Sequence, residues 1–298
     1  MTRTVTVGLD GSPASLAAAE WAAREAEMRG LPLHLVHAWD WQRYAEPASE
    51  DSTHQHWALR ILREATEQLH RGHPGLTITY EQVSQAPGTA LLGASEEADP
   101  LVIGSRGLGG VTGFLVGSVA LGVVAQTDRP VVLVRSGTRP EDERRPDAEG
   151  RPSAETPYRD VVLGLDHEHP DATVIAFAFE SASRRAARLR VVHGWSLPPY
   201  FAYGAATDQA LNEELARQEA GAVKAALAPW REKFPGVEVV EDAVIGNAGG
   251  HLVDAAADAS LVVVGRRIRR TPLGARIGPV AHAVLHHAKA PVAVVPHE

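Results

Sequence analysis

The sequence contains two copies of one pattern. The motif VTVGLD near the N-terminus returns as VVLGLD, and LVHAW returns as VVHGW, each 156 positions later, whereas two further motifs return 161 positions later. The four segments and their counterparts are residues 5–10 and 161–166, 35–39 and 191–195, 101–106 and 262–267, and 129–134 and 290–295. A repeat of this length in a chain of 298 residues predicts two domains of the same fold.

A segment rich in proline and charge separates the two copies. Its centre, residues 139–146, reads RPEDERRP. Such a sequence offers too little apolar surface to bury in a core, so we expect a linker. The chain is therefore divided into a first domain of residues 1–137, a linker of residues 138–157 and a second domain of residues 158–298.

Each copy alternates short β-branched runs with longer alanine-rich stretches, which predicts βαβ units. Ser12 before Pro13 is typical of a helix N-terminus, and Gly30 and Gly72 are typical of helix C-termini. We expect an α/β fold in which each domain has an open, five-stranded parallel sheet with helices on both faces, a Rossmann-like arrangement. In the first copy the predicted strands are residues 3–9, 33–39, 76–83, 101–104 and 130–135, and the predicted helices are residues 13–29, 55–71, 88–98 and 118–127.

Composition excludes several classes of function. Lys and Arg total 29 against 37 Asp and Glu, and the net charge of −8 argues against non-specific nucleic-acid binding. The absence of Cys excludes disulfides, thiol catalysis and Cys-ligated zinc or iron–sulfur sites. The N-terminus lacks the apolar stretch of a signal peptide, and no window approaches the roughly 18 apolar residues of a membrane span. We therefore expect a cytoplasmic protein that binds neither nucleic acid nor membrane.

Two glycine-containing loops follow predicted strands in the first copy. Residues 8–12 read GLDGS, and residues 104–118 read GSRGLGGVTGFLVGS. Ligands of open α/β sheets bind beyond the carboxyl ends of the strands, and Gly117–Ser118 before a helix directs backbone N–H groups at an anion. The sequence has neither a P-loop nor a GxGxxG motif after the first strand, which argues against a nicotinamide dehydrogenase. A phosphate-binding loop and a glycine-rich surface loop without a ligand both remain open.

The loop residues resemble a known family. The spacing runs Gly104-x-x-Gly107, nine residues and then Gly117-Ser118. Together with an Asp-Gly-Ser turn at residues 10–12 and Val-His-Ala at residues 36–38, it is similar to universal stress proteins in their tandem form. The resemblance covers nearly the whole chain, and its glycine spacing is typical of the ATP-binding branch. It implies an adenine nucleotide alpha hydrolase-like fold and ATP as the ligand of the first domain.

The resemblance also implies which residues bind the nucleotide. It places Gly8, Leu9 and Asp10 on the base and ribose side and Ala38 against the adenine. Asp10 would accept from a ribose hydroxyl or hold Mg²⁺ through water. Arg106 either adds a cation or is a solvated loop residue. The expected ribose and phosphate loop comprises Gly104, Ser105, Arg106, Gly107, Gly117, Ser118 and Val119.

The second copy departs from this motif. Ile268 stands at the second glycine and Pro279 at the serine. A β-branched residue disfavours positive φ and proline has no N–H, so we expect an intact fold with a damaged phosphate site. A cluster of arginines either captures an anion there or is solvated: Arg266, Arg267, Arg269, Arg270 and Arg276.

The histidines do not predict a metal site. His167 and His169 beside Asp166 are interpreted as a solvated turn, and the pair at residues 286–287, on the last predicted helix, is no stronger a candidate. His37 and His193 recur in the second strand of each copy, where we expect hydrogen bonds to backbone. No histidine–serine or paired-carboxylate arrangement marks a hydrolase.

Three functions remain open. The preferred one is an ATP-binding regulator of a stress or dormancy response, and the alternatives are a slow ATPase and a nucleotide-free scaffold. The last strand of each copy, at residues 131–134 and 292–295, is strongly apolar. Such strands invite pairing, so we expect an intramolecular domain pair or a homodimer, and the identity of any protein partner stays open.

Overall fold

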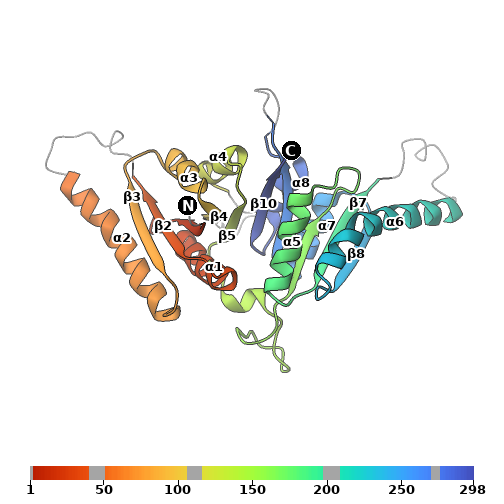
Figure 1. Ribbon diagram of the computed structural model, residues 1–298, viewed down its shortest axis with the longest axis horizontal. Coiled ribbons are helices and arrows are strands. Elements are labelled where there is room, and N and C mark those ends of the chain that lie inside the picture. Colours follow the sequence, from red (N-terminus) through yellow and green to blue (C-terminus); the bar gives the residue numbers. More distant parts are fainter. Residues whose placement is uncertain (1–2, 40–50, 106–115, 197–208, 270–275) are drawn as a thin grey trace. The chain divides into compact units, whose positions relative to one another are not determined.

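The computed structural model describes residues 3–39, 51–105, 116–196, 209–269 and 276–298 (Figure 1). The chain divides into two compact units, each containing one copy of the repeat. One comprises Met1–Pro140, and the other comprises Glu141–Arg269 and Gly278–Glu298. Within the described residues, no helix has the length and apolarity needed to cross a membrane.

The first unit is a parallel sheet between two pairs of helices. The strands lie in the order β3-β2-β1-β4-β5, and all neighbours are parallel. Helix α1 packs beside α2, and α3 packs beside α4 (Figure 1). The strands are β1 (Thr4–Gly8), β2 (Leu33–Ala38), β3 (Ile78–Val83), β4 (Ala98–Ser105) and β5 (Val131–Arg135), and the helices are α1 (Pro13–Arg29), α2 (Asp51–Gly72), α3 (Pro87–Ser95) and α4 (Ser118–Gln126).

The second unit repeats this topology. Its parallel strands lie in the order β8-β7-β6-β9-β10, with α5 beside α6 and α7 beside α8. The predicted α/β class and five-stranded parallel sheets are therefore confirmed. The strands are β6 (Asp160–Gly164), β7 (Leu189–Trp195), β8 (Val239–Ile245), β9 (Ala259–Arg267) and β10 (Val292–His297), and the helices are α5 (Ala172–Arg184), α6 (Gln209–Lys233), α7 (Ala248–Ala255) and α8 (Pro279–His287), with a 3₁₀ turn at Ala256–Asp258.

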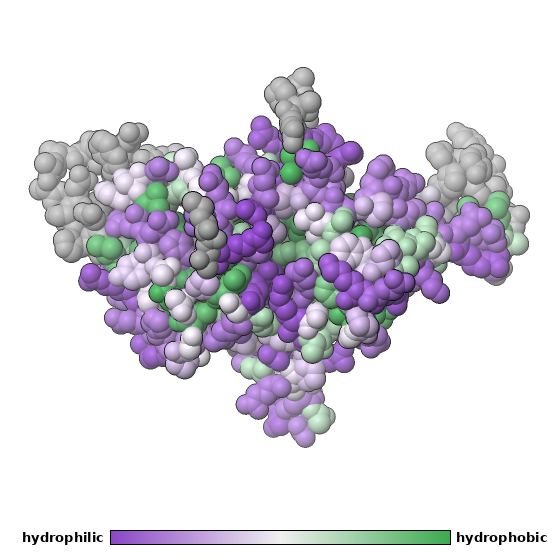
Figure 2. All heavy atoms as spheres, viewed as in Figure 1, coloured by the Kyte–Doolittle hydropathy of each residue, from purple (hydrophilic) through white to green (hydrophobic). Residues whose placement is uncertain are grey.

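The core of the first unit includes strand residues and small residues on one face of α1. Ala18, Ala22 and Ala26 of α1 are fully buried, and their short side chains let the helix axis lie close to β1 and β4. Hydrophilic residues predominate on the face shown in Figure 2. This division between buried apolar and exposed polar residues is that of an ordinary globular core.

The predicted ends of the first helix are confirmed. Ser12 has extended backbone angles and its hydroxyl accepts from the N–H of Ser15, while Gly30 ends the helix with a φ of +63°. The helix predicted at residues 88–98 is too long, because α3 ends at Ser95 and β4 begins at Ala98. Glu96 and Glu97 form a turn between the two elements, and Ala98 already pairs with Thr4 of β1 in the sheet.

The segment between the two copies contains local structure. A 3₁₀ turn spans Pro140–Glu143, and Arg144 pairs with Tyr158 in an isolated antiparallel bridge. The Arg144 guanidinium also lies 3.8 Å from the centre of the Tyr158 ring. Glu143 is only 2% exposed. These contacts hold the segment against the start of the second repeat.

Candidate functional site

The topology of the first unit brings its two glycine-containing loops together. Strand β1 lies between β2 and β4. The chain therefore runs from β1 toward β2 on one side and from β4 toward β5 on the other, so the strand order reverses between β1 and β4. Gly8 ends β1 and is in register with Ile103 of β4, directly before Gly104. Such a reversal of strand order opens a crevice at the carboxyl ends, where α/β proteins bind ligands. Ala38 ends the neighbouring β2.

Two of the predicted binding glycines lie close to other parts of the unit, and one of them is required by packing. A Cβ on Gly104 would lie 2.5 Å from the backbone carbonyl carbon and oxygen of Ala14, at the start of α1. A Cβ on Gly8 would lie 2.8 Å from a methyl group of Leu91 in α3. The first contact is with rigid backbone and the second with the end of a flexible side chain. Gly104 is therefore the position that tolerates no side chain.

The loop after β1 is held by a histidine from β2. The Leu9 carbonyl accepts from Nδ1 of His37 at 2.7 Å, and the Leu9 N–H donates to the carbonyl of Val36. The predicted hydrogen bond of His37 to backbone is confirmed, and the residue is only 5% exposed. Asp10 follows with an exposed carboxylate whose Oδ1 accepts from the N–H of Ser12 at 2.9 Å. This bond fixes the direction of the carboxylate.

Helix α4 presents an open N-terminus. Gly117 precedes the helix with φ −63° and ψ 152°, and among the described residues no side chain caps it. Gly117, Ser118 and Val119 are all exposed. A Cβ on Gly117 would meet no described heavy atom within 4 Å. The first N–H groups of α4 and the Ser118 hydroxyl are therefore accessible to an anion.

Ser105 has a structural role that the sequence did not reveal. Its hydroxyl donates to the carbonyl of Val134 at 3.3 Å and accepts from Nη1 of Arg135 at 3.2 Å. Ser105 is 1% exposed and Arg135 is 5% exposed, and burial lowers the pKa of Arg135 to about 10. The Ser105 side chain is committed to the β4–β5 junction, so we do not retain it among the ligand contacts. Arg106 and Gly107 lie outside the described residues.

The second unit keeps the helix start but changes its chemistry. Gly278 precedes α8 with φ −68° and ψ 161°, close to the angles of Gly117, and Pro279 is the first helical residue. The N–H of Ile268 donates to the carbonyl of His297. Arg266 is 4% exposed, so its burial argues against the anion capture considered for it. Arg267, Arg269 and Arg276 are exposed, and Arg270 lies outside the described residues.

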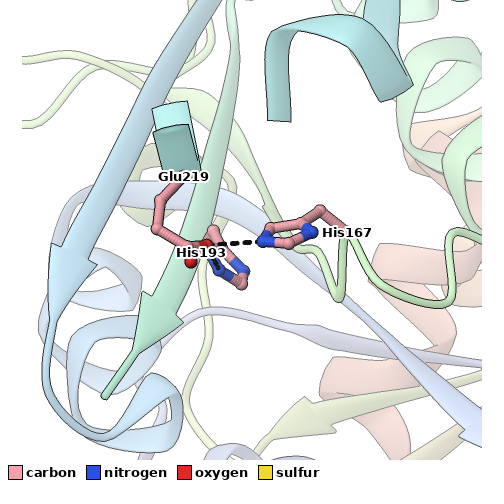
Figure 3. Close-up of side chains that lie close together, drawn as sticks. All are labelled: His167, His193 and Glu219. Carbon is pink, nitrogen blue, oxygen red and sulfur yellow. Dashed lines mark hydrogen bonds and ion pairs between the residues drawn. The ribbon is translucent and has the colours of Figure 1, made fainter. Parts of the chain in front are cut away.

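A cluster that sequence reasoning missed lies in the second unit. His167 after β6, His193 of β7 and Glu219 of α6 converge on one another (Figure 3). Oε2 of Glu219 is 2.5 Å from Nε2 of His167 and 3.2 Å from Nε2 of His193. The centroids of the His167 and His193 imidazole rings are 4.3 Å apart. Glu219 gives no signal in the sequence, because it is 26 residues from His193 and meets it only through the packing of α6.

Comparison with known proteins agrees with this tandem α/β architecture. A model of the universal stress protein family matches residues 1–135 and 157–296. The chain belongs to the universal stress protein family, in a form with two copies of the domain.

Relatives match over nearly their whole length. Universal stress protein Rv2005c of Mycobacterium tuberculosis is 33% identical over 309 residues, covering 97% of this chain and 96% of the relative. Universal stress protein Rv2623 of the same species is 32% identical, covering 97% and 95%. The crystal structure of a universal stress protein from Archaeoglobus fulgidus superposes with a TM-score of 0.65 at 14% identity, covering 99% of this chain and 98% of that one. This last likeness supports the fold.

Proposed function

We propose that the first unit binds ATP at the carboxyl ends of β1 and β4, and that occupancy of this site regulates a stress or dormancy response. The observation that carries the proposal is the open N-terminus of α4. Its exposed Gly117 and Ser118 complete the glycine spacing that begins at Gly104. A helix N-terminus without a side-chain cap favours a phosphate, because N–H groups and the helix dipole both face the anion.

Each proposed contact has a physical basis. The N–H groups at the start of α4 and the Ser118 hydroxyl donate to phosphate oxygens. Asp10, whose carboxylate is exposed and oriented by Ser12, accepts from a ribose hydroxyl or holds Mg²⁺ through water. Ala38, at the end of β2, offers backbone groups to the adenine. Between them, the Leu9 carbonyl is held by His37, and Gly8 has no side chain that would fill the space beside the ligand.

The test is Gly117→Val, with titration calorimetry against ATP. A branched side chain at this open position leaves the described fold undisturbed but occupies the space of the phosphates, so ATP binding should be lost. Gly278→Val is the matched control, because it precedes α8 with similar backbone angles and also meets no described heavy atom within 4 Å. Equal ATP affinity in the Gly117→Val variant and the parent protein would reject the site.

A further inference from the structure

In the cluster of His167, His193 and Glu219, the hydrogen bonds of His193 require a positive charge between its ring and the Glu219 carboxylate. Nδ1 of His193 lies 3.0 Å from the carbonyl oxygen of Leu165, which can only accept, so Nδ1 carries a hydrogen. In a neutral imidazole, Nε2 then holds a lone pair. That lone pair lies 3.2 Å from Oε2 of Glu219, which is also an acceptor. The contact is stable only if a second proton or a metal cation lies between the two atoms.

We propose that the second unit binds a divalent transition-metal ion of the Zn²⁺ class through Nε2 of His167, Nε2 of His193 and the carboxylate of Glu219. The three ligand atoms lie within 4.8 Å of one another. Two histidines and one carboxylate are an established ligand set for zinc, and imidazole nitrogens favour zinc over calcium or magnesium. The proposal concerns the second unit and does not depend on ATP binding by the first.

The distances suit a metal after a small adjustment. Zinc bonds of about 2.0–2.1 Å place tetrahedral ligand atoms about 3.3 Å apart. His193 Nε2 and Glu219 Oε2 already lie at 3.2 Å, whereas His167 Nε2 is 2.5 Å from the same oxygen and must move outward. His167 can do so because it lies in the turn before α5, between exposed Asp166 and Glu168. Three protein ligands leave a fourth position for water.

The surroundings orient the proposed ligands. Metal-binding histidines commonly donate their other ring N–H to a backbone carbonyl, which fixes the tautomer, and His193 does this through Leu165. The side chains of His193, His167 and Glu219 are 9%, 14% and 27% exposed. The site is thus sheltered but reachable from solvent. Figure 3 shows all three side chains pointing toward a common centre.

The equivalent positions of the first copy do not repeat this ligand set. His37 corresponds to His193 and makes the same bond to a backbone carbonyl, here that of Leu9. Gly11 stands in the position of His167. Alignment of the HPG sequence at residues 73–75 with FPG at residues 234–236 places Ala58 opposite Glu219. One proposed ligand of three is therefore present, so metal binding should belong to the second unit alone.

The experiment titrates Zn²⁺ into untagged full-length protein in competition with a chromophoric chelator, after removal of bound metal. The chelator outcompetes weak Zn²⁺ binding by the other histidines of the chain, which contains 14 in all. We expect about one tight Zn²⁺ per chain, and a loss of affinity of at least about 100-fold in Glu219→Gln and in His167→Ala. Thermal unfolding adds a second readout, because Zn²⁺ should raise the Tm of the parent protein and not of these variants.

Two controls separate this site from other histidines. His169→Ala removes the exposed histidine of the same turn, which lies near Asp166 and Glu168. His282→Ala removes one of the two neighbouring histidine rings on α8, whose centroids are 4.4 Å apart. Both variants should bind Zn²⁺ like the parent. Loss of binding in either control, or equal binding in the parent and in Glu219→Gln, would overturn the proposal. A parent protein that binds no Zn²⁺ would show that the cluster is an ion pair between protonated imidazole and carboxylate.

Discussion

Gly104 illustrates how one residue can satisfy a binding motif and a packing requirement together. The motif assigns it to the nucleotide loop, whereas the structure places the backbone of Ala14 where its side chain would be. We expect Gly104→Ala to lower the free energy of unfolding by roughly 1–3 kcal/mol, because backbone of α1 must move to admit a methyl group. Urea unfolding of the full chain measures this change.

A glycine in open space provides the control for this prediction. Gly93 lies inside α3, and a Cβ there would meet no described heavy atom within 4 Å. Gly93→Ala should stabilise by roughly 0.5–1 kcal/mol through helix propensity. If Gly104→Ala were as stable as the parent, the close contact with α1 would not govern this position.

Single residues differ in how far the sequence predicts them. Ser12 and Gly30 were predictable because their roles depend on neighbours in sequence. The burial of Ser105 was not, because its hydroxyl bonds to β5, which follows about 30 residues later. Glu219 was missed for the same reason, since only the tertiary packing of α6 brings it to His167.

At the scale of elements, α1 and α4 begin in different ways although a serine stands near each start. Ser12 precedes α1 and caps it, whereas Ser118 is the first residue of α4 and follows uncapped Gly117. We expect Ser12→Ala to cost about 1 kcal/mol of stability. Ser118→Ala should leave stability within about 0.5 kcal/mol, as an exposed substitution, and weaken ATP binding by removing a donor to phosphate.

The two serine variants are compared by chemical unfolding and by ATP titration of the same preparations. The proposal requires the effects to separate, with stability lost in Ser12→Ala and affinity lost in Ser118→Ala. A Ser118→Ala variant that was destabilised as strongly as Ser12→Ala would assign Ser118 a structural role instead.

The helices and strands of the first copy could be predicted from sequence pattern, whereas some of their boundaries could not. Alternating β-branched and alanine-rich runs predicted the strands and helices of the first copy, since period and composition are local properties. The predicted helix at residues 88–98 extended too far because the alanine-rich pattern continues to Ala98, whereas Ala98 pairs with Thr4 of β1, a tertiary contact that a local pattern does not encode. The contacts around Arg144 and Tyr158 were not predicted, because charge and proline content describe burial and not specific pairing.

For the whole molecule, the repeat was the strongest predictor, since two copies of one βαβ pattern require two copies of one sheet. The structure confirms five parallel strands in each unit. The pairing of the terminal strands, within one chain or between two, stays a prediction from their apolar sequence. The divergence of the copies matters more for function, because the same topology supports a proposed nucleotide site in one unit and a proposed metal site in the other.

This divergence predicts the stoichiometry of nucleotide binding. Pro279 removes both the N–H and the hydroxyl that Ser118 offers at the equivalent helix start, and Ile268 replaces a glycine of the motif. We therefore expect about one tight ATP per chain, since of the helix starts at Gly117 and Gly278 only that of α4 keeps both the N–H and the hydroxyl of a serine. Calorimetric titration of the full chain with ATP measures the ratio directly. Two equivalent ATP sites per chain would show that the exposed arginines of the second copy of the repeat, Arg267, Arg269 and Arg276, bind phosphate in place of backbone N–H groups.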